Sequence, residues 1–191
     1  LLGIIIYNCF KNGTTFALNS LTNRASLITQ IYFPRSIPAI SSAITASIML
    51  AIEVGILLVF MIGFQFVPPI TILLLPLILG LQFMLVVGVC LPLSVLNVKF
   101  KDIEFIWGIV LHAGFFLTPI FYRFDMLPEY VQNILQLSPV VQIVEMVHHV
   151  TLYGTLPSLN SVLYSVGSIF AILGIGYLIF RRYQSRFVEE L

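Results

Sequence analysis

The sequence predicts an all-α polytopic membrane protein, and its composition and its apolar stretches carry this prediction. Of the 191 residues, 59% are hydrophobic and 9% are charged, and the mean hydropathy is +1.06. Soluble domains usually hold about 25% charged residues, so this chain lacks the polar surface that a water-soluble domain needs. Helices satisfy their own backbone groups in lipid, and the alternating pattern of a barrel strand is missing from the apolar stretches. A soluble globular domain is therefore excluded.

Five stretches are candidate membrane spans, each of which needs about 20 mainly apolar residues. Leu1 to Leu21 is apolar apart from Lys11 and three Asn residues, and indicates a span cut near its beginning or one with a polar face turned inward. Two of the later stretches exceed a perpendicular crossing, so tilt, protruding ends or bends at Pro76 and Pro92 are expected. The four later stretches are residues 37–64, 70–98, 105–122 and 162–180.

Charge sets the expected orientation of these spans. Threading them through a membrane places eight of the nine Lys and Arg residues at one end and only Arg123 at the other. Because basic connections mark the cytoplasmic side, residues 22–36, residues 97–104 and the C-terminus are predicted to be cytoplasmic. Residues 65–69 then form an external turn and residues 123–160 an external segment. The net charge of +1 excludes a strongly basic nucleic-acid binder.

The external segment, residues 123–160, contains two amphipathic helical patterns that are separated at Ser138-Pro139. Ser suits the N-cap of a helix and Pro suits its first position. Neither pattern is long enough to cross a bilayer. The segment therefore predicts two half-length helices that are either re-entrant or lie in the membrane interface.

Five short motifs follow one another on the two sides of the membrane that charge assigns: LITQIYFPR at 27–35, LNVKFKDI at 96–103, TPIFY at 118–122, LPE at 127–129 and SPVVQIVE at 138–145. With these motifs the chain resembles the permease subunit of type-2 ABC exporters, in the branch that exports O-antigen, capsular polysaccharide or teichoic acid. The resemblance implies one type-2 ABC transmembrane domain over residues 1–191. It also implies about five spans here and six in the intact chain, whose N-terminal amphipathic helix and first span are missing.

The resemblance implies a permease that moves lipid-linked polysaccharide across the bacterial inner membrane, as a homodimer bound to two ATP-binding subunits. The chain has no Gly-rich phosphate loop, so ATP and Mg are expected on the partner subunit and no cofactor on this chain. Two alternatives stay open: a type-2 ABC permease for drugs or small lipids, and an integral membrane enzyme of lipid-linked sugar metabolism. The enzyme is disfavoured because the longest loop holds few acid or base groups.

Residues 22–36 form the candidate ATPase-coupling segment, because apolar and aromatic side chains flanked by Arg would dock on another subunit. Ordinary anchoring at the membrane interface is the alternative. The loop at 97–104 is a second candidate contact, or simply a basic stop on the cytoplasmic side. The residues assigned to coupling are Arg24, Ser26, Leu27, Ile31, Tyr32, Phe33, Arg35, Lys99, Lys101 and Asp102.

Glu53, Phe115 and Tyr122 are the candidates for the conduit or the dimer seam. A carboxylate within a span costs about 2.5–3.5 kcal/mol on insertion scales, so Glu53 should face protein or water. Lys11 would be its partner if the first span packs beside the second; a protonated Glu53 bonded to a neighbouring helix is the alternative. The two aromatic rings would stack on sugars or belong to an interfacial belt.

Glu145 and His148 are the candidates on the external helices. Their i, i+3 spacing occurs in carboxylate-bridged metal sites, but a di-metal site needs further carboxylates that this chain lacks. A hydrated polar face is therefore expected, and no metal.

Overall fold

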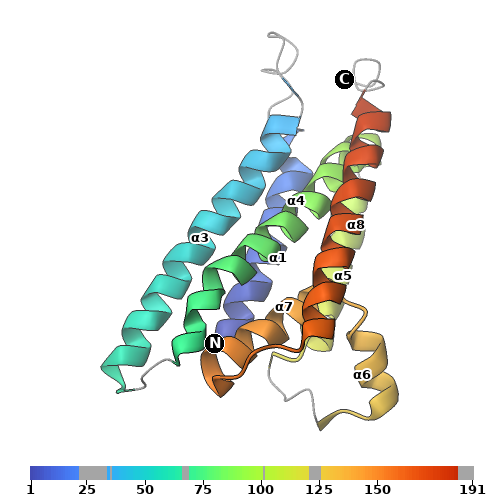
Figure 1. Ribbon diagram of the computed structural model, residues 1–191. Helices are drawn as coiled ribbons and strands as arrows, with labels where there is room; N and C mark the ends of the chain where they lie inside the picture. The colour runs from blue at the N-terminus through green and yellow to red at the C-terminus, as the bar shows by residue number, and fades with distance from the viewer. Residues whose placement is uncertain (22–33, 35, 66–68, 101, 121–125, 185–191) are drawn as a thin grey trace.

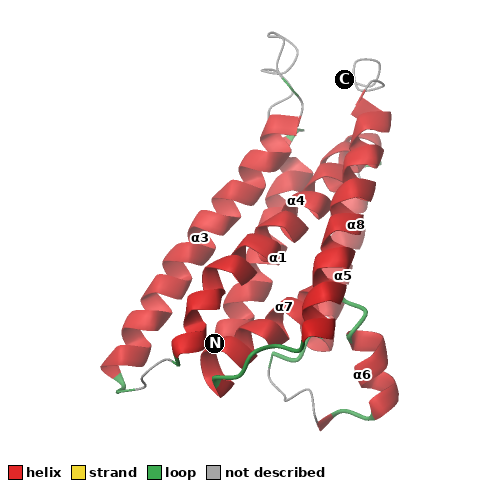
Figure 2. Cartoon of the chain, viewed as in Figure 1, coloured by secondary structure: helices red, strands yellow, loops and turns green. Residues whose placement is uncertain are grey.

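The computed structural model describes residues 1–21, 34, 36–65, 69–100, 102–120 and 126–184. Within these residues the regular elements are helices, and strands are absent (Figure 2). The predicted all-α fold class is confirmed.

Long helices run side by side along the molecule, and short ones gather at one end (Figure 1). The short turn η2 (Ile70–Leu74) leads into a long helix, and η4 (His149–Tyr153) follows a short one. The Lys99 end of one long helix and the Tyr183 end of another lie opposite the short helices, as the threading predicts. The long helices are α1 (Leu2–Ser20), α3 (Ser36–Gly63), α4 (Leu75–Lys99) and α8 (Leu159–Tyr183), with α5 (Ile103–Leu117), α6 (Glu129–Leu135) and α7 (Pro139–His148) as the shorter ones.

Three segments of the described chain are long and apolar enough to cross a membrane: Ser36–Gly63, Ile70–Lys99 and Leu159–Tyr183. The predicted span 105–122 is wrong at its end, because α5 stops at Leu117 after 15 residues. Pro119 explains this end, since a proline forces the preceding residue out of the helical region, and Thr118 has φ −75° and ψ 133°. At about 1.5 Å per residue, α5 measures about 22 Å and falls short of a hydrocarbon core about 30 Å thick.

Helix α1 lies at the centre of the bundle, and polar side chains of α4 bind its backbone at two levels. Gln82 donates its amide hydrogen to the Ile6 carbonyl at 3.1 Å, and Asn97 donates to the Leu18 carbonyl at 2.9 Å. Both side chains are buried. Because lipid offers no competing hydrogen bond, these contacts fix the register of α4 on α1.

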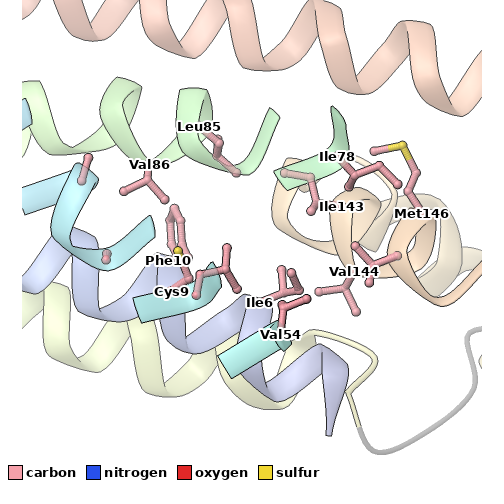
Figure 3. Close-up of a cluster of buried hydrophobic side chains, with 14 of the residues drawn as sticks. Ile6, Cys9, Phe10, Val54, Ile78, Leu85, Val86, Ile143, Val144 and Met146 are labelled. Carbon is pink, nitrogen blue, oxygen red and sulfur yellow. The ribbon is translucent and has the colours of Figure 1, made fainter. Parts of the chain in front are cut away.

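One apolar core joins α1, α3, α4 and α7 (Figure 3). Ile6 of α1, Val86 of α4 and Val144 of α7 are fully buried. Small residues let the backbones of α1 and α3 approach: a Cβ on Gly13 would lie 3.2 Å from the Cβ of Ala46. The core therefore positions α1 against three neighbouring helices.

The two predicted external half-helices have different surroundings. Helix α7 buries six of its ten residues against α1, α4 and α8, so it is packed within the protein. Helix α6 buries only Leu135 and stands at the edge of the molecule (Figure 1). Helix α7 is therefore part of the packed bundle and α6 is not, and the choice between a re-entrant and an interfacial position stays a prediction.

The α4–α8 contact depends on Gly88, Pro92 and Gly176. Pro92 has no N–H with which to bond the carbonyl of Gly88, four residues earlier. A Cβ on Gly176 would collide with that same carbonyl oxygen, and a Cβ on Gly88 would lie 3.0 Å from the Leu173 backbone. The helices therefore approach closely where the proline has released a carbonyl.

We predict that Gly176→Ala lowers the free energy of unfolding by about 1–3 kcal/mol, the usual range for overpacking, because backbone atoms must move. The measurement is thermal unfolding in lipid nanodiscs. Gly174→Ala is the matched control, since open space surrounds its Cβ position. Equal melting temperatures for the two variants would show that the α4–α8 contact is not close at Gly176.

Candidate functional site

Helix α5 is joined to α1 by polar contacts at three levels. Near one end, Asn19 donates to the Glu104 carboxylate at 2.9 Å. In the middle, the indole N–H of Trp107 donates to the Thr14 hydroxyl at 3.0 Å. Further along, the Tyr7 hydroxyl donates to the Leu111 carbonyl at 2.5 Å. These contacts determine which face of α5 lies against α1.

A pocket of about 280 Å³ lies beside this contact, between α1 and α5. Tyr7, Phe115 and Phe116 supply aromatic walls, and the rings of Tyr7 and Phe115 meet edge to face with centroids 5.4 Å apart. Asn8, Lys11 and His112 supply the polar lining. We call this surface the α1–α5 groove.

Two polar side chains of the α1–α5 groove lack hydrogen-bond partners in the part of the chain that the structure describes. The Lys11 side chain is exposed, and neither its ammonium group nor the Asn8 amide makes a hydrogen bond there. His112 Nδ1 donates to the Gly108 carbonyl oxygen at 2.7 Å, which leaves Nε2 for another partner. Lipid cannot hydrogen-bond such groups, and intramembrane charges face a protein interior or a water-filled cavity. The groove must therefore face water, another protein surface or a polar cargo.

Asn8, Lys11, Thr15 and Asn19 lie at intervals of three and four residues on α1, which places them on one helix face. This favours the interpretation of residues 1–21 as a span with a polar face. The spacing was available in the sequence and could have identified Asn8 as a groove residue. Sequence spacing could not have identified His112 as a groove residue, because that depends on α5 packing against α1.

Glu53 borders a different face of α1 from the face that lines the groove. It lines an apolar cavity of about 640 Å³ together with Leu2, Phe60 and His148. The condition for a Lys11–Glu53 pair is met, because α1 packs against α3, but the pairing itself is wrong. Lys11 faces α5, and no ion pair joins these two described residues.

Of the three conduit candidates, the structure places Phe115 in the groove and Glu53 in the separate apolar cavity. Tyr122 lies outside the described residues. Phe115 and Glu53 therefore do not share one surface of the chain.

Most of the predicted coupling residues lie outside the described part of the chain: Arg24, Ser26, Leu27, Ile31, Tyr32, Phe33, Arg35 and Lys101. Lys99 ends α4, and its ammonium group lies 5.2 Å from the ring centre of Phe100 and 5.5 Å from that of Tyr183. Asp102 precedes the first residue of α5 but caps no backbone N–H with its side chain. The coupling role of these residues stays a prediction.

Glu145 and His148 line different cavities although they are neighbours on α7. Glu145 lines a polar pocket with His149, whereas His148 lines the apolar cavity with Glu53. In the described residues no group of three or more His, Cys, Asp or Glu side chains is placed to hold a metal. The two side chains therefore line separate spaces on α7.

His148 packs against the first turn of α1, where a Cβ on Gly3 would lie 3.4 Å from His148 Nε2. Burial lowers the pKa of His148 below its ordinary value of 6.5, because a charged imidazole loses hydration in an apolar site. Burial therefore favours the neutral ring at this position, where His148 is partly exposed.

The chain is similar to known membrane transport proteins. The family model described as "ABC-2 type transporter" matches residues 1–152. Two proteins of Klebsiella pneumoniae, both described as "O-antigen export system permease protein RfbA", are 28% and 26% identical to it over 191 residues. Each alignment covers 99% of this chain and 73% of the relative.

We predict that acid destabilises the protein through His148. The unfolded chain binds this proton more tightly than the folded chain, so the free energy of unfolding decreases as pH falls below about 6.5. Between pH 7.5 and 5.5 the melting temperature should fall more for the parent protein than for His148→Gln. Between pH 7.5 and 8.5 the melting temperatures of the two proteins should change with pH almost equally. Parallel melting-temperature curves from pH 7.5 to 5.5 would contradict the packing of a neutral ring.

Proposed function

Because the chain belongs to the ABC-2 type transporter family, we propose that it is the permease subunit of an ATP-driven exporter of lipid-linked polysaccharide. The cargo would be of the O-antigen, capsule or teichoic acid type. In this proposal the chain lies in the bacterial inner membrane with its C-terminus in the cytoplasm. The basic ends of α4 and α8 support this orientation.

The α1–α5 groove is the observation that carries the proposal. A permease must offer its cargo a polar path through lipid, and the groove brings an amide, an ammonium group and an imidazole to helix faces that lack other partners in the described chain. Phe115 and Phe116 add aromatic rings beside them. This combination suits a hydroxyl-rich polymer that slides past without tight binding, since rings pack on apolar faces while polar groups exchange hydrogen bonds.

A second copy of the chain would close the groove. Helix α5 buries only Leu111, and Phe105, Ile109 and Phe116 on it are 75%, 55% and 72% exposed. A helix that is both short and poorly covered leaves its polar neighbours open on one side. A homodimer with α1 and α5 of each copy at the seam would enclose a conduit between them.

Two ATP-binding subunits would supply the energy, with ATP and Mg bound to them. Residues 22–36 and the loop that contains Lys99 and Asp102 would dock on these subunits. The end of α1 at Ser20, the start of α3 at Ser36 and the end of α4 at Lys99 lie at the same end of the bundle (Figure 1), so one partner could contact both segments. A permease for drugs or small lipids is the second candidate, favoured by the 640 Å³ apolar cavity around Glu53.

The decisive experiment is Lys11→Met in the cell, with surface polysaccharide and intracellular polymer measured together. We expect surface polymer to fall at least tenfold and polymer to accumulate inside, because the groove loses its fixed charge. Protein abundance in the membrane should stay normal, since Lys11 is exposed and makes no hydrogen bond with its side chain. Arg181→Gln, which removes a charge on the exposed end of α8, is the control and should export normally.

Normal surface polymer in a strain without this chain would overturn the polysaccharide assignment. Accumulation of a drug or lipid in that same strain would favour the second candidate. Normal export by Lys11→Met would instead remove the groove from the transport path.

A further inference from the structure

A second polar pocket, of about 370 Å³, lies where α7 and η4 meet the start of α8. It is at the end of the bundle that carries the short helices, opposite the basic end (Figure 1). Its volume is within the 300–1,000 Å³ range of small-molecule sites. We call it the α7–α8 pocket; its polar lining is Gln142, Glu145, His149, Thr155, Ser158 and Ser161.

Gln142 is the strongest indication that the α7–α8 pocket receives a ligand. Gln142 is only 5% exposed, and its side-chain amide N–H donates to the Gln136 carbonyl at 3.0 Å. Its amide oxygen accepts no hydrogen bond from the described residues. The buried unpaired side-chain atoms of the described residues are Gln82 Oε1 and Asn97 Oδ1 and do not include this oxygen. The Gln142 oxygen therefore opens onto the pocket, where a donor from a ligand would bind it.

Hydrogen bonds hold the other polar groups of the pocket in place. His149 Nδ1 lies 2.8 Å from the Thr155 hydroxyl, which leaves Nε2 turned to other partners. The Ser158 hydroxyl accepts from the Ser161 backbone N–H at 3.2 Å and lies 2.7 Å from the Ser161 hydroxyl. Such fixed groups bind a ligand with a smaller loss of side-chain entropy.

The lining selects the chemical class of the ligand. Glu145 is the acidic group and no Lys or Arg lines the described pocket, so phosphates and other anions are disfavoured. Hydroxyl, amide and carboxylate groups match a ligand with many hydroxyl groups, and Met146, Leu156 and Pro157 supply an apolar wall for its C–H face. A neutral pyranose ring has both properties.

We propose that the α7–α8 pocket is a saccharide-binding site that holds one neutral sugar unit at the external end of the permease. Its natural ligand, a unit of the emerging polymer, rests on the proposed function. Binding there would keep the polymer from sliding back between power strokes.

Saturation-transfer NMR on the full chain in lipid nanodiscs tests the proposal with methyl glycosides of glucose, galactose, mannose and N-acetylglucosamine. Nanodiscs avoid the sugar headgroups of maltoside detergents. We expect transfer to at least one glycoside and weaker transfer to glucuronate or inorganic phosphate. No transfer to any of the four glycosides, or a preference for an anion, would overturn the proposal.

Variants locate the binding. Ser161→Ala removes one hydroxyl from the pocket but leaves the backbone cap on Ser158, and should weaken the apparent affinity about threefold to tenfold, the value of one hydrogen bond. Gln142→Leu should abolish transfer; melting temperature monitors its folding. Ser168→Ala, on the same helix and bonded to the Ser165 carbonyl, is the matched control. Equal affinity of Ser161→Ala and Ser168→Ala would place the sugar elsewhere and contradict the proposal.

The surface-polymer assay separates this inference from the proposed function. If the parent protein exports polymer but the NMR experiment detects no glycoside binding to it, the pocket is refuted and the proposed function stands. Glycoside binding that is weakened in Ser161→Ala, with surface polymer unaffected by deletion of the chain, would support the pocket and refute the polymer as its ligand.

Discussion

Lipid offers no hydrogen bonds, and this constraint explains why polar side chains of α4 and α5 bind to α1 within the bundle. Gln82 and Asn97 of α4 donate to carbonyls of α1, and Trp107 of α5 donates to Thr14. Each such bond is costly to leave unmade in an apolar surrounding. Helix α1 is therefore held on two sides by polar contacts that fix its neighbours in register. The same constraint leaves Asn8 and Lys11 as groups that need a partner from outside the described chain.

Close packing supplies what polar contacts do not. Gly88 and Gly176 let α4 and α8 approach at the carbonyl that Pro92 cannot bond. Small residues at a helix contact increase dispersion contacts between backbones, which substitute for the hydrophobic effect in lipid. A bundle with rigid contacts between α1, α4 and α8 and a sparsely covered α5 is suited to movement at α5, because weakly packed elements open at the lowest free-energy cost.

The sequence predicted the helical fold, the two groups of helix ends and the half-helices, because hydropathy and charge alone determine these features. It also predicted α7 from Ser138 and Pro139, and α7 begins at Pro139. The sequence misjudged the end of α5, where Pro119 outweighed a continuing apolar run. It also paired Lys11 with Glu53, although the two residues line separate spaces beside different faces of α1. Side-chain direction around a helix axis decides such pairs, and it depends on which helices become neighbours. For the same reason, neither the α1–α5 groove nor the α7–α8 pocket was predicted as a unit.

The central claim is that the polar face of α1 is turned away from lipid. Nitroxide labels at Asn8→Cys and Phe170→Cys, with Cys9 and Cys90 replaced by Ala, test it directly by power saturation in vesicles. Phe170 of α8 is 54% exposed and should face the acyl chains. The account predicts that the label at residue 8 collides more often with a water-soluble nickel chelate than the label at residue 170 does. It also predicts that the label at residue 8 collides less often with oxygen. Equal, oxygen-dominated collisions at both positions would contradict it.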